Sequence, residues 1–149
     1  MKKKLLIIGS FLALIGIAFY LFNKPHRDVA NSEIDKKIQA ESLVQYFLDH
    51  PIKANIEYLA SDGESKILLV SGKIVSISED QLGQKVIMLD GNNRMGVSCS
   101  FTIKTNGQTS VLAKGQHVKI KGVIRSGAEY DEDLDLAEDV ILEKCSLIR

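Results

Sequence analysis

An uninterrupted apolar segment near the N-terminus constrains this chain more than any other feature. Leu5 to Phe22 is a run of 18 residues without a charged side chain, and Lys2, Lys3 and Lys4 precede it. As a helix the run spans roughly 27 Å, close to the thickness of a bilayer's hydrocarbon core. Its end is aromatic, and the nearest alanine, Ala30, has Asp28 two positions before it, which matches a signal-peptidase site poorly. The sequence therefore predicts an uncleaved transmembrane signal anchor at residues 5–22, with a cleaved signal peptide and a buried core helix as alternatives.

The basic residues around this segment predict its orientation. Three lysines precede it, whereas only Lys24 and Arg27 follow it closely. Because basic residues are enriched on the cytoplasmic side, residues 1–4 are expected to form a cytoplasmic tip. The chain is then a single-pass protein of the bacterial cytoplasmic membrane, with residues 23–37 as a polar linker to a C-terminal domain on the extracytoplasmic (periplasmic) side.

The zero net charge of the whole chain conceals an acidic C-terminal part. Residues 28–149 carry 14 of the 19 basic residues and all 19 acidic residues, a net charge of −5. Binding to phosphates depends on clustered Lys and Arg, so this charge disfavours nucleic acid as a default partner. About 120 residues form one domain, large enough to bury its own core.

A helical lead-in is predicted over residues 38–60. Leu43, Val44, Phe47 and Leu48 repeat at a helical period within Ile38–Asp49, and His50-Pro51 should end or kink that helix. A second short helix over Ile52–Leu59 would present Ile56 and Leu59. Both helices are expected to pack on the domain rather than to bind a ligand.

From residue 61 onward the pattern is that of strands. Five apolar or alternating segments are separated by turn residues: Ile67–Ile77 with Gly72 inside it, Val86–Leu89, Val97–Phe101, Val118–Ile124 with Gly122 inside it, and Val140–Leu147. A longer connection, Thr105–Lys114, separates the third strand from the fourth and includes a short predicted helix at Ser110–Ala113. This arrangement is typical of the five-stranded Greek-key barrel called the OB-fold, so the fold class is mainly β.

Four segments also resemble a known family: Val70–Ile77, Gly96–Phe101, Leu112–Gly122 and Val140–Leu147. They are similar to the bacterial tRNA_anti-like family of OB-fold proteins, over roughly residues 38–149. The resemblance implies an OB-fold domain of uncharacterised activity, commonly behind an N-terminal signal or lipoprotein anchor. Members often have a cysteine where this chain has Val123, and the chain has no cysteine near the apolar segment. Its anchorage is therefore expected to come from the helix itself.

The residues expected at a binding surface fall into two groups. Lys114, Lys119, Lys121 and Arg125 are the best basic candidates, although alternate lysines on a barrel strand usually form its solvated face. Phe101 and Tyr130 are the only aromatic residues after Glu64. OB-folds that bind single-stranded nucleic acid stack its bases on aromatic side chains. Two aromatic residues are few for that purpose.

An acidic loop contributes the second group, Tyr130, Asp131, Asp133 and Asp135. The alternate aspartates resemble the first ligands of a calcium loop, but Leu136 stands where the sharp-turn glycine belongs and Leu142 where the bidentate glutamate belongs. A solvated turn at the barrel rim is expected, with a weak cation site as the alternative and no assigned metal or cofactor.

Cys99 and Cys145 fall on the third and fifth strands, which are neighbours in an OB barrel. In an oxidising compartment they are expected to form a disulfide, and the alternative is two buried free thiols. None of the three histidines pairs with a nucleophile or has a metal-site spacing. The chain is therefore not expected to be an enzyme.

The sequence thus predicts a membrane-anchored extracytoplasmic binding or scaffold module that recognises a protein or another envelope component. The outer face of the barrel and the rim loops at residues 79–85, 90–96 and 126–135 would form the surface. Binding of single-stranded nucleic acid or an oligosaccharide on that face is the alternative.

Overall fold

The computed structural model describes residue 16 and residues 28–61, 64–92 and 94–148. Apart from Gly16, the predicted anchor at 5–22 lies outside these residues, as do the tip at 1–4 and residues 23–27 of the predicted linker. Among the described helices none has the length and apolar character needed to cross a bilayer.

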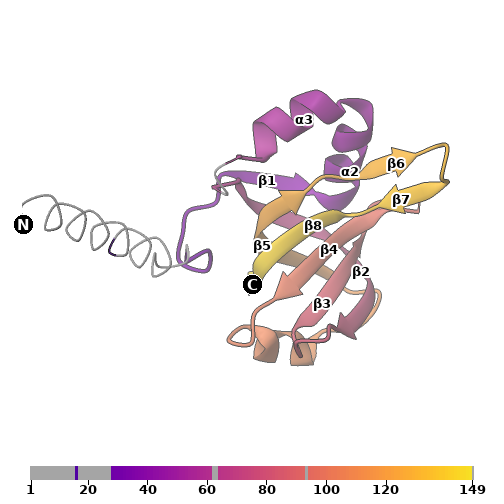
Figure 1. Cartoon of the computed structure of the whole chain (residues 1–149). Coiled ribbons are helices and arrows are strands. Elements are labelled where there is room, and N and C mark those ends of the chain that lie inside the picture. The colour runs from indigo at the N-terminus through magenta and orange to yellow at the C-terminus, as the bar shows by residue number, and fades with distance from the viewer. Residues whose placement is uncertain (1–15, 17–27, 62–63, 93, 149) are drawn as a thin grey trace, which may run out of the picture.

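Five strands close into a barrel. They are β2 (Ile67–Glu79), β3 (Lys85–Asp90), β4 (Gly96–Phe101), β5 (His117–Ser126) and β8 (Val140–Ile148). Their order is β2-β3-β4-β8-β5, and pairing of β5 with the first half of β2 closes the ring. The pairs are antiparallel except for β4 with β8, which run parallel (Figure 1). This is the predicted five-stranded Greek-key barrel.

The long strand β2 serves both halves of the barrel. Its first half pairs with β5 from Ile67 to Lys73, and its second half pairs with β3 from Ile74 onward. The register shifts between Ile74 and Ser76, so the bulge falls just after Gly72. A Cβ at Gly72 would lie 3.0 Å from the Ala40 Cβ, so glycine here allows a helix to approach the strand.

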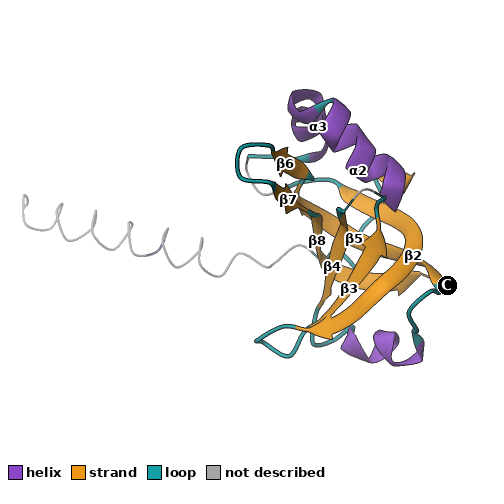
Figure 2. Ribbon diagram, turned by 90° about the vertical axis from the view of Figure 1, so that its right-hand side faces the viewer, coloured by secondary structure: helices purple, strands orange, loops and turns teal. Residues whose placement is uncertain are grey.

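Two helices cover one end of the barrel, and a short 3-10 helix lies at the other (Figures 1 and 2). Helix α2 (Ala40–Asp49) and helix α3 (Pro51–Tyr58) meet at His50, as the His50-Pro51 pair predicts. The 3-10 helix η1 (Asn106–Val111) starts earlier than the predicted helix at Ser110–Ala113. Helix α2 buries Leu43, Val44 and Phe47 as its periodicity predicts.

Helix α3 does not pack with the predicted face. It buries Ala54 and Tyr58, whereas Ile56 is 78% exposed and Leu59 is half-buried. The reason is aromatic packing, because the Tyr58 ring lies 5.7 Å from the Phe47 ring and 5.9 Å from the Tyr46 ring. That contact turns the Ile56 side of the helix towards solvent.

Residues 28–39 belong to the domain, although the sequence pattern predicts a linker as far as residue 37. Strand β1 (Lys36–Gln39) pairs in parallel with the first half of β2, from Lys36 opposite Leu68 to Gln39 opposite Ser71. Lys36 Nζ also lies 2.6 Å from Glu57 Oε1, and the Tyr46 hydroxyl donates to Glu57 Oε2 at 2.7 Å. These contacts fix β1 against both helices, and they raise the pKa of Lys36 and lower that of Glu57.

A second feature absent from the predicted fold is a hairpin between β5 and β8. Strands β6 (Glu129–Asp131) and β7 (Leu136–Glu138) pair with Tyr130 opposite Ala137. The acidic segment that the sequence predicts as an open loop is therefore an ordered projection from the rim of the barrel (Figure 1).

Candidate functional site

The four predicted basic residues do not form one surface. Lys114 is exposed in the turn before β5, and Arg125 Nε donates to Glu143 Oε2 at 2.8 Å near the other end of that strand. Lys121 is only 5% exposed. Its Nζ donates to the carbonyl oxygens of Ala30, at 2.8 Å, and Ser32. Of the four, Lys119 remains as an exposed cation on the barrel wall, and no hydrogen bond or ion pair of its side chain is found within the described part of the chain.

Lys121 is therefore a structural residue, and its replacement is a direct test of that role. We expect Lys121→Met to lower the free energy of unfolding by about 1.5 kcal/mol, because two charge-assisted hydrogen bonds are lost. It should also release the 28–34 segment from β5, so that a Glu-specific protease cleaves the chain after Glu33 at a higher rate. Lys119→Met, two residues away on the same face, is the matched control and should leave cleavage unchanged. Equal cleavage of both variants would contradict the assignment.

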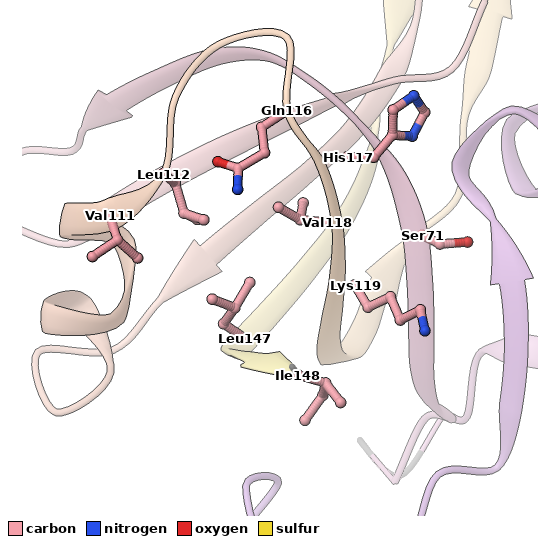
Figure 3. A pocket seen from close by; sticks show the side chains of 9 residues that line it. All are labelled: Ser71, Val111, Leu112, Gln116, His117, Val118, Lys119, Leu147 and Ile148. Carbon is pink, nitrogen blue, oxygen red and sulfur yellow. The ribbon is translucent and has the colours of Figure 1, made fainter.

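A groove lies beside Lys119 on the wall formed by β2, β5 and β8. It has a volume of about 560 Å³ and is lined by Ser71, Val111, Leu112, Gln116, His117, Val118, Lys119, Leu147 and Ile148. Figure 3 shows Leu112, Val118 and Leu147 around its centre, with His117 and Lys119 on the side of Ser71. The lining contains no acidic residue. The groove is thus an apolar depression with a basic edge. No local sequence pattern indicates it, because η1 and β8 are far apart in the sequence and come together only in the fold.

The predicted acidic residues are mostly engaged in the hairpin itself. Asp131 Oδ1 accepts from the backbone N–H groups of Asp133 and Leu134, at 2.9 and 3.1 Å. Asp135 Oδ1 accepts from the Tyr130 hydroxyl at 2.7 Å and from Arg94 Nη1 at 2.9 Å. Asp133 itself is exposed. Among the described residues no group of three or more His, Cys, Asp or Glu could hold a metal ion.

The contacts of Asp135 predict how the hairpin responds to acid. The Tyr130 hydroxyl, followed by the Arg94 guanidinium, holds the pKa of Asp135 below its usual 3.8. The contacts of ionised Asp135 therefore stabilise the hairpin at pH values above 3.8. This stabilisation is lost as the pH falls through the lower pKa that Asp135 has in the folded protein. We expect NMR signals of the Tyr130 ring to move in this acid range and Asp135→Asn to abolish the movement. A Tyr130 titration that survives in Asp135→Asn would contradict this origin.

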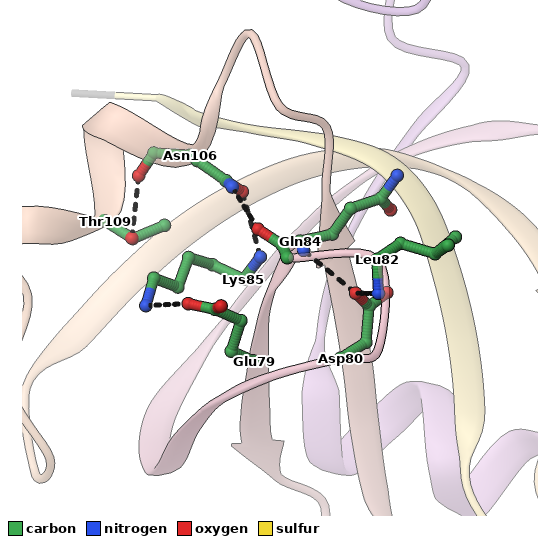
Figure 4. Close-up of polar contacts among 8 residues, drawn as sticks. Glu79, Asp80, Leu82, Gln84, Lys85, Asn106 and Thr109 are labelled. Carbon is green, nitrogen blue, oxygen red and sulfur yellow. Dashed lines mark hydrogen bonds and ion pairs between the residues drawn. The ribbon is translucent and has the colours of Figure 1, made fainter.

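The rim loop between β2 and β3 is held by a polar network (Figure 4). Asp80 Oδ1 accepts from the N–H groups of Leu82 and Gln84, at 2.8 and 2.9 Å. Asn106, at the start of η1, donates to the Gly83 carbonyl at 2.8 Å and accepts from the Lys85 N–H at 2.9 Å. The loop is thus fixed to η1, a role for Asn106 that no local sequence signal indicates.

The outer side of β3 and β4 is the surface on which OB-folds usually bind ligands. We call it the barrel face. Cross-strand pairing places Val86 opposite Ser100, and Met88 opposite Ser98. All four are half-buried, and they alternate with the core residues Ile87, Leu89, Val97, Cys99 and Phe101. Neighbouring strands extend the face with Ser76, Ser78 and Ile141. A hollow of about 230 Å³ lies at one end, lined by Val75, Met88, Leu89, Asp90, Arg94, Met95, Gly96 and Asp139.

The barrel face is uncharged at its centre and has no aromatic side chain among the residues that define it. Among the described Phe and Tyr residues, only Tyr130 is more than a third exposed, at 41%, and it lies on the hairpin. Two cations near its ends are in ion pairs, Lys85 with Glu79 at 2.6 Å and Arg94 with Asp135 at 2.9 Å. This surface offers hydroxyl groups and apolar contacts rather than stacking platforms or phosphate contacts.

Cys99 and Cys145 both point into the core and are free thiols in the structure. They belong to the adjacent strands β4 and β8, as predicted. Burial, together with the neighbouring Cys99 thiol, raises the pKa of Cys145 well above its usual value. The disulfide between them stays a prediction.

Comparisons with known proteins give a family and a fold. The tRNA_anti-like family model matches residues 1–134. A lipoprotein from Klebsiella pneumoniae, described as a candidate nucleic acid-binding protein, has a similar structure with a TM-score of 0.53 and 19% identity, over 84% of this chain and 100% of its own. The Stn1-Ten1 complex of S. pombe matches 58% of this chain and 62% of its own, with 18% identity and a TM-score of 0.40. A search of curated proteins finds no match.

Proposed function

Because this chain belongs to the tRNA_anti-like family, whose model matches most of its length, we propose that it is a membrane-anchored binding module. In this proposal the apolar segment Leu5–Phe22 is the anchor and the OB barrel lies outside the cytoplasm. The barrel recognises a protein or another envelope component with its barrel face, and it performs no catalysis. The fold supports a binding role, since OB barrels use this face for ligands.

The chemistry of the barrel face is the observation that favours an uncharged partner over a polyanion. Serines from β2 and β4 surround Val86, Met88 and Ile141, and Ile141 is 40% exposed. A polyanion would need unpaired Lys or Arg here, whereas the nearby cations Lys85 and Arg94 are both in ion pairs. An uncharged or weakly polar partner, such as an extended polypeptide segment, fits this surface better.

The anchoring part of the proposal is tested by cell fractionation. Full-length protein with a reporter fused after Arg149, active only outside the cytoplasm, is expected to be active and to sediment with the membrane fraction. A matched variant with two charges placed in the apolar run, Leu12→Lys and Ile15→Lys, should lose membrane retention. Activity of a cytoplasmic reporter in its place would overturn the topology.

The recognition part is tested by photo-crosslinking in cells. A photoreactive amino acid at Ser98, at the centre of the barrel face, is expected to give a discrete crosslinked species by immunoblot. The same amino acid at Lys53 on α3 is the control, since it is exposed and lies near the far end of the barrel. Crosslinks of equal yield from both positions would indicate non-specific contact and contradict the proposal.

The alternative is binding of single-stranded nucleic acid or an oligosaccharide on the same face. The Klebsiella lipoprotein described as a candidate nucleic acid-binding protein favours keeping this alternative. Salt separates the two, because phosphate-driven binding weakens steeply as the salt concentration rises. If our proposal is correct, the protein should show no affinity for an oligothymidine probe that depends on the salt concentration. Tight binding at low salt that disappears at high salt would favour the alternative.

A further inference from the structure

The N-terminal end of the described domain is packed on the same wall as the groove. Val29 is 2% exposed and packs with Ile67 and Val123, which lie on β2 and β5. Lys121, also on β5, holds the carbonyl groups of Ala30 and Ser32. The 28–32 segment therefore runs over β5, and the chain enters the domain at this wall.

The length of chain before this point limits how far the wall can lie from a membrane. The apolar run ends at Phe22, so only residues 23–27 separate it from Asp28. Asp28 is therefore six residue steps from Phe22, and six steps, even fully extended, reach at most about 22 Å. If the apolar run is the anchor, as the proposed function holds, the wall that receives Asp28 stays within about that distance of the end of the anchor.

The groove adjoins this segment. Lys119 precedes Lys121 by two residues on β5, so both side chains point to the same outer side of the strand. Lys119 pairs with Ser71 on β2 and with Ile148 on β8, and both partners line the groove. The basic edge of the groove therefore lies on the membrane-proximal wall and not on the barrel face. Val118 and Leu147 alternate with these residues and turn towards the end of the barrel covered by η1, where Leu112 completes the apolar lining.

The chemistry of the groove suits one constituent of that membrane. Leu112, Val118, Leu147 and Ile148 give it an apolar lining, and Val111 at its edge is 70% exposed (Figure 3). Lys119 and His117 supply the basic edge, and neither side chain makes a hydrogen bond or ion pair within the described residues. An apolar floor beside an unpaired cation is complementary to a lipid acyl chain beside a phosphate.

We propose that this groove binds an anionic phospholipid of the membrane to which the chain is tethered, with the acyl region on the apolar lining and the phosphate at Lys119. The inference rests on the proposed anchoring, and it adds a second surface to the barrel face. Lipid binding would hold the domain on the bilayer in one orientation. The hairpin and the barrel face, which is centred on β3 and β4, consist of other residues and would stay available to a partner.

The test places a reporter at the groove and at a matched distant position. Full-length Val111→Cys and Ile52→Cys are labelled with a thiol-reactive bimane, since Cys99 and Cys145 are buried and Val111 and Ile52 are 70% and 77% exposed. Each is reconstituted into vesicles containing anionic lipid with brominated acyl chains, which quench bimane on contact. We expect about two-fold quenching at position 111 and almost none at position 52, because only residues that enter the interface reach the acyl chains.

The charge is tested by Lys119→Gln, with Lys53→Gln on α3 as the control. Lys119→Gln should weaken quenching at position 111 in anionic vesicles and have no effect in neutral ones, whereas Lys53→Gln should change neither. Equal quenching at positions 111 and 52, or no quenching at 111 in protein that floats with the vesicles, would overturn the groove proposal alone. Concentration-dependent crosslinking of Val111→Cys to itself would assign the groove to a second copy. Protein that fails to float would instead overturn the anchoring.

Discussion

Replacing Gly127 with alanine is expected to lower the free energy of unfolding by about 3 kcal/mol. Gly127 precedes the hairpin and packs against the Phe47 ring of α2. An added Cβ would lie 2.7 Å from the Phe47 Cγ and closer still to its Cδ1 and Cε1. Phe47 is fully buried among Leu43, Val44 and Tyr58, so its ring has no free space to move into.

Gly107→Ala is the matched control for this prediction. A Cβ at Gly107 meets nothing within 4 Å, so the substitution should change stability by no more than about 0.5 kcal/mol. Reducing the ring in Phe47→Leu should restore part of the stability lost in Gly127→Ala, which a double-mutant cycle by urea denaturation would detect as coupling. Additive effects would show that the contact with Phe47 is not the cause.

Oxidation of Cys99 and Cys145 is expected to have an effect of similar size. A disulfide would close a loop of about 45 residues and stabilise the fold by about 2–4 kcal/mol, mainly by restricting the unfolded chain. Because both thiols are buried and the pKa of Cys145 is raised, the folded thiol form should oxidise slowly. The bond is therefore expected to form before or during folding in an oxidising compartment.

Mass and stability together check this expectation. Protein recovered from the oxidising side of the membrane should be about 2 Da lighter than its reduced form and should unfold at a higher urea concentration. The Cys99→Ala, Cys145→Ala double variant provides the reference without either thiol. A native mass equal to the reduced mass, with no effect of reductant on unfolding, would leave both residues as buried thiols and weigh against the extracytoplasmic location.

The barrel was predictable because its signals are local to each strand. Val97, Cys99 and Phe101 alternate with serines and face the core as alternation requires. Gly72 and Gly122 lie in β2 and β5, close to places where the register of these strands shifts. Strand β1 was not predictable, since in Lys36–Gln39 only Ile38 is apolar and even it is only half-buried. It is held by backbone pairing with β2, which leaves no pattern in its own residues.

The candidate site was less predictable because its properties depend on distant partners. Lys119 and Lys121 look equivalent in the sequence, yet Lys121 is buried by carbonyl groups about 90 residues earlier in the chain. The aspartates of the acidic loop suggest a cation site, but Asp131 and Asp135 accept hydrogen bonds from groups of the hairpin itself. Exposure of Ile56 could not be foreseen either, since it follows from how Tyr58 packs on Phe47.

The position of β8 has a consequence for how the chain acquires its structure. This last strand lies between β4 and β5, with parallel pairing on one side and antiparallel pairing on the other. Until residues 140–148 leave the ribosome, both neighbours have an unpaired edge and the ring is open. Closure of the barrel must therefore wait for residues 140–148, and it should be slow in comparison with the folding of helical proteins, because β8 joins strands that are distant in the sequence. Until then β4 and β5 each expose an edge that could pair with another chain.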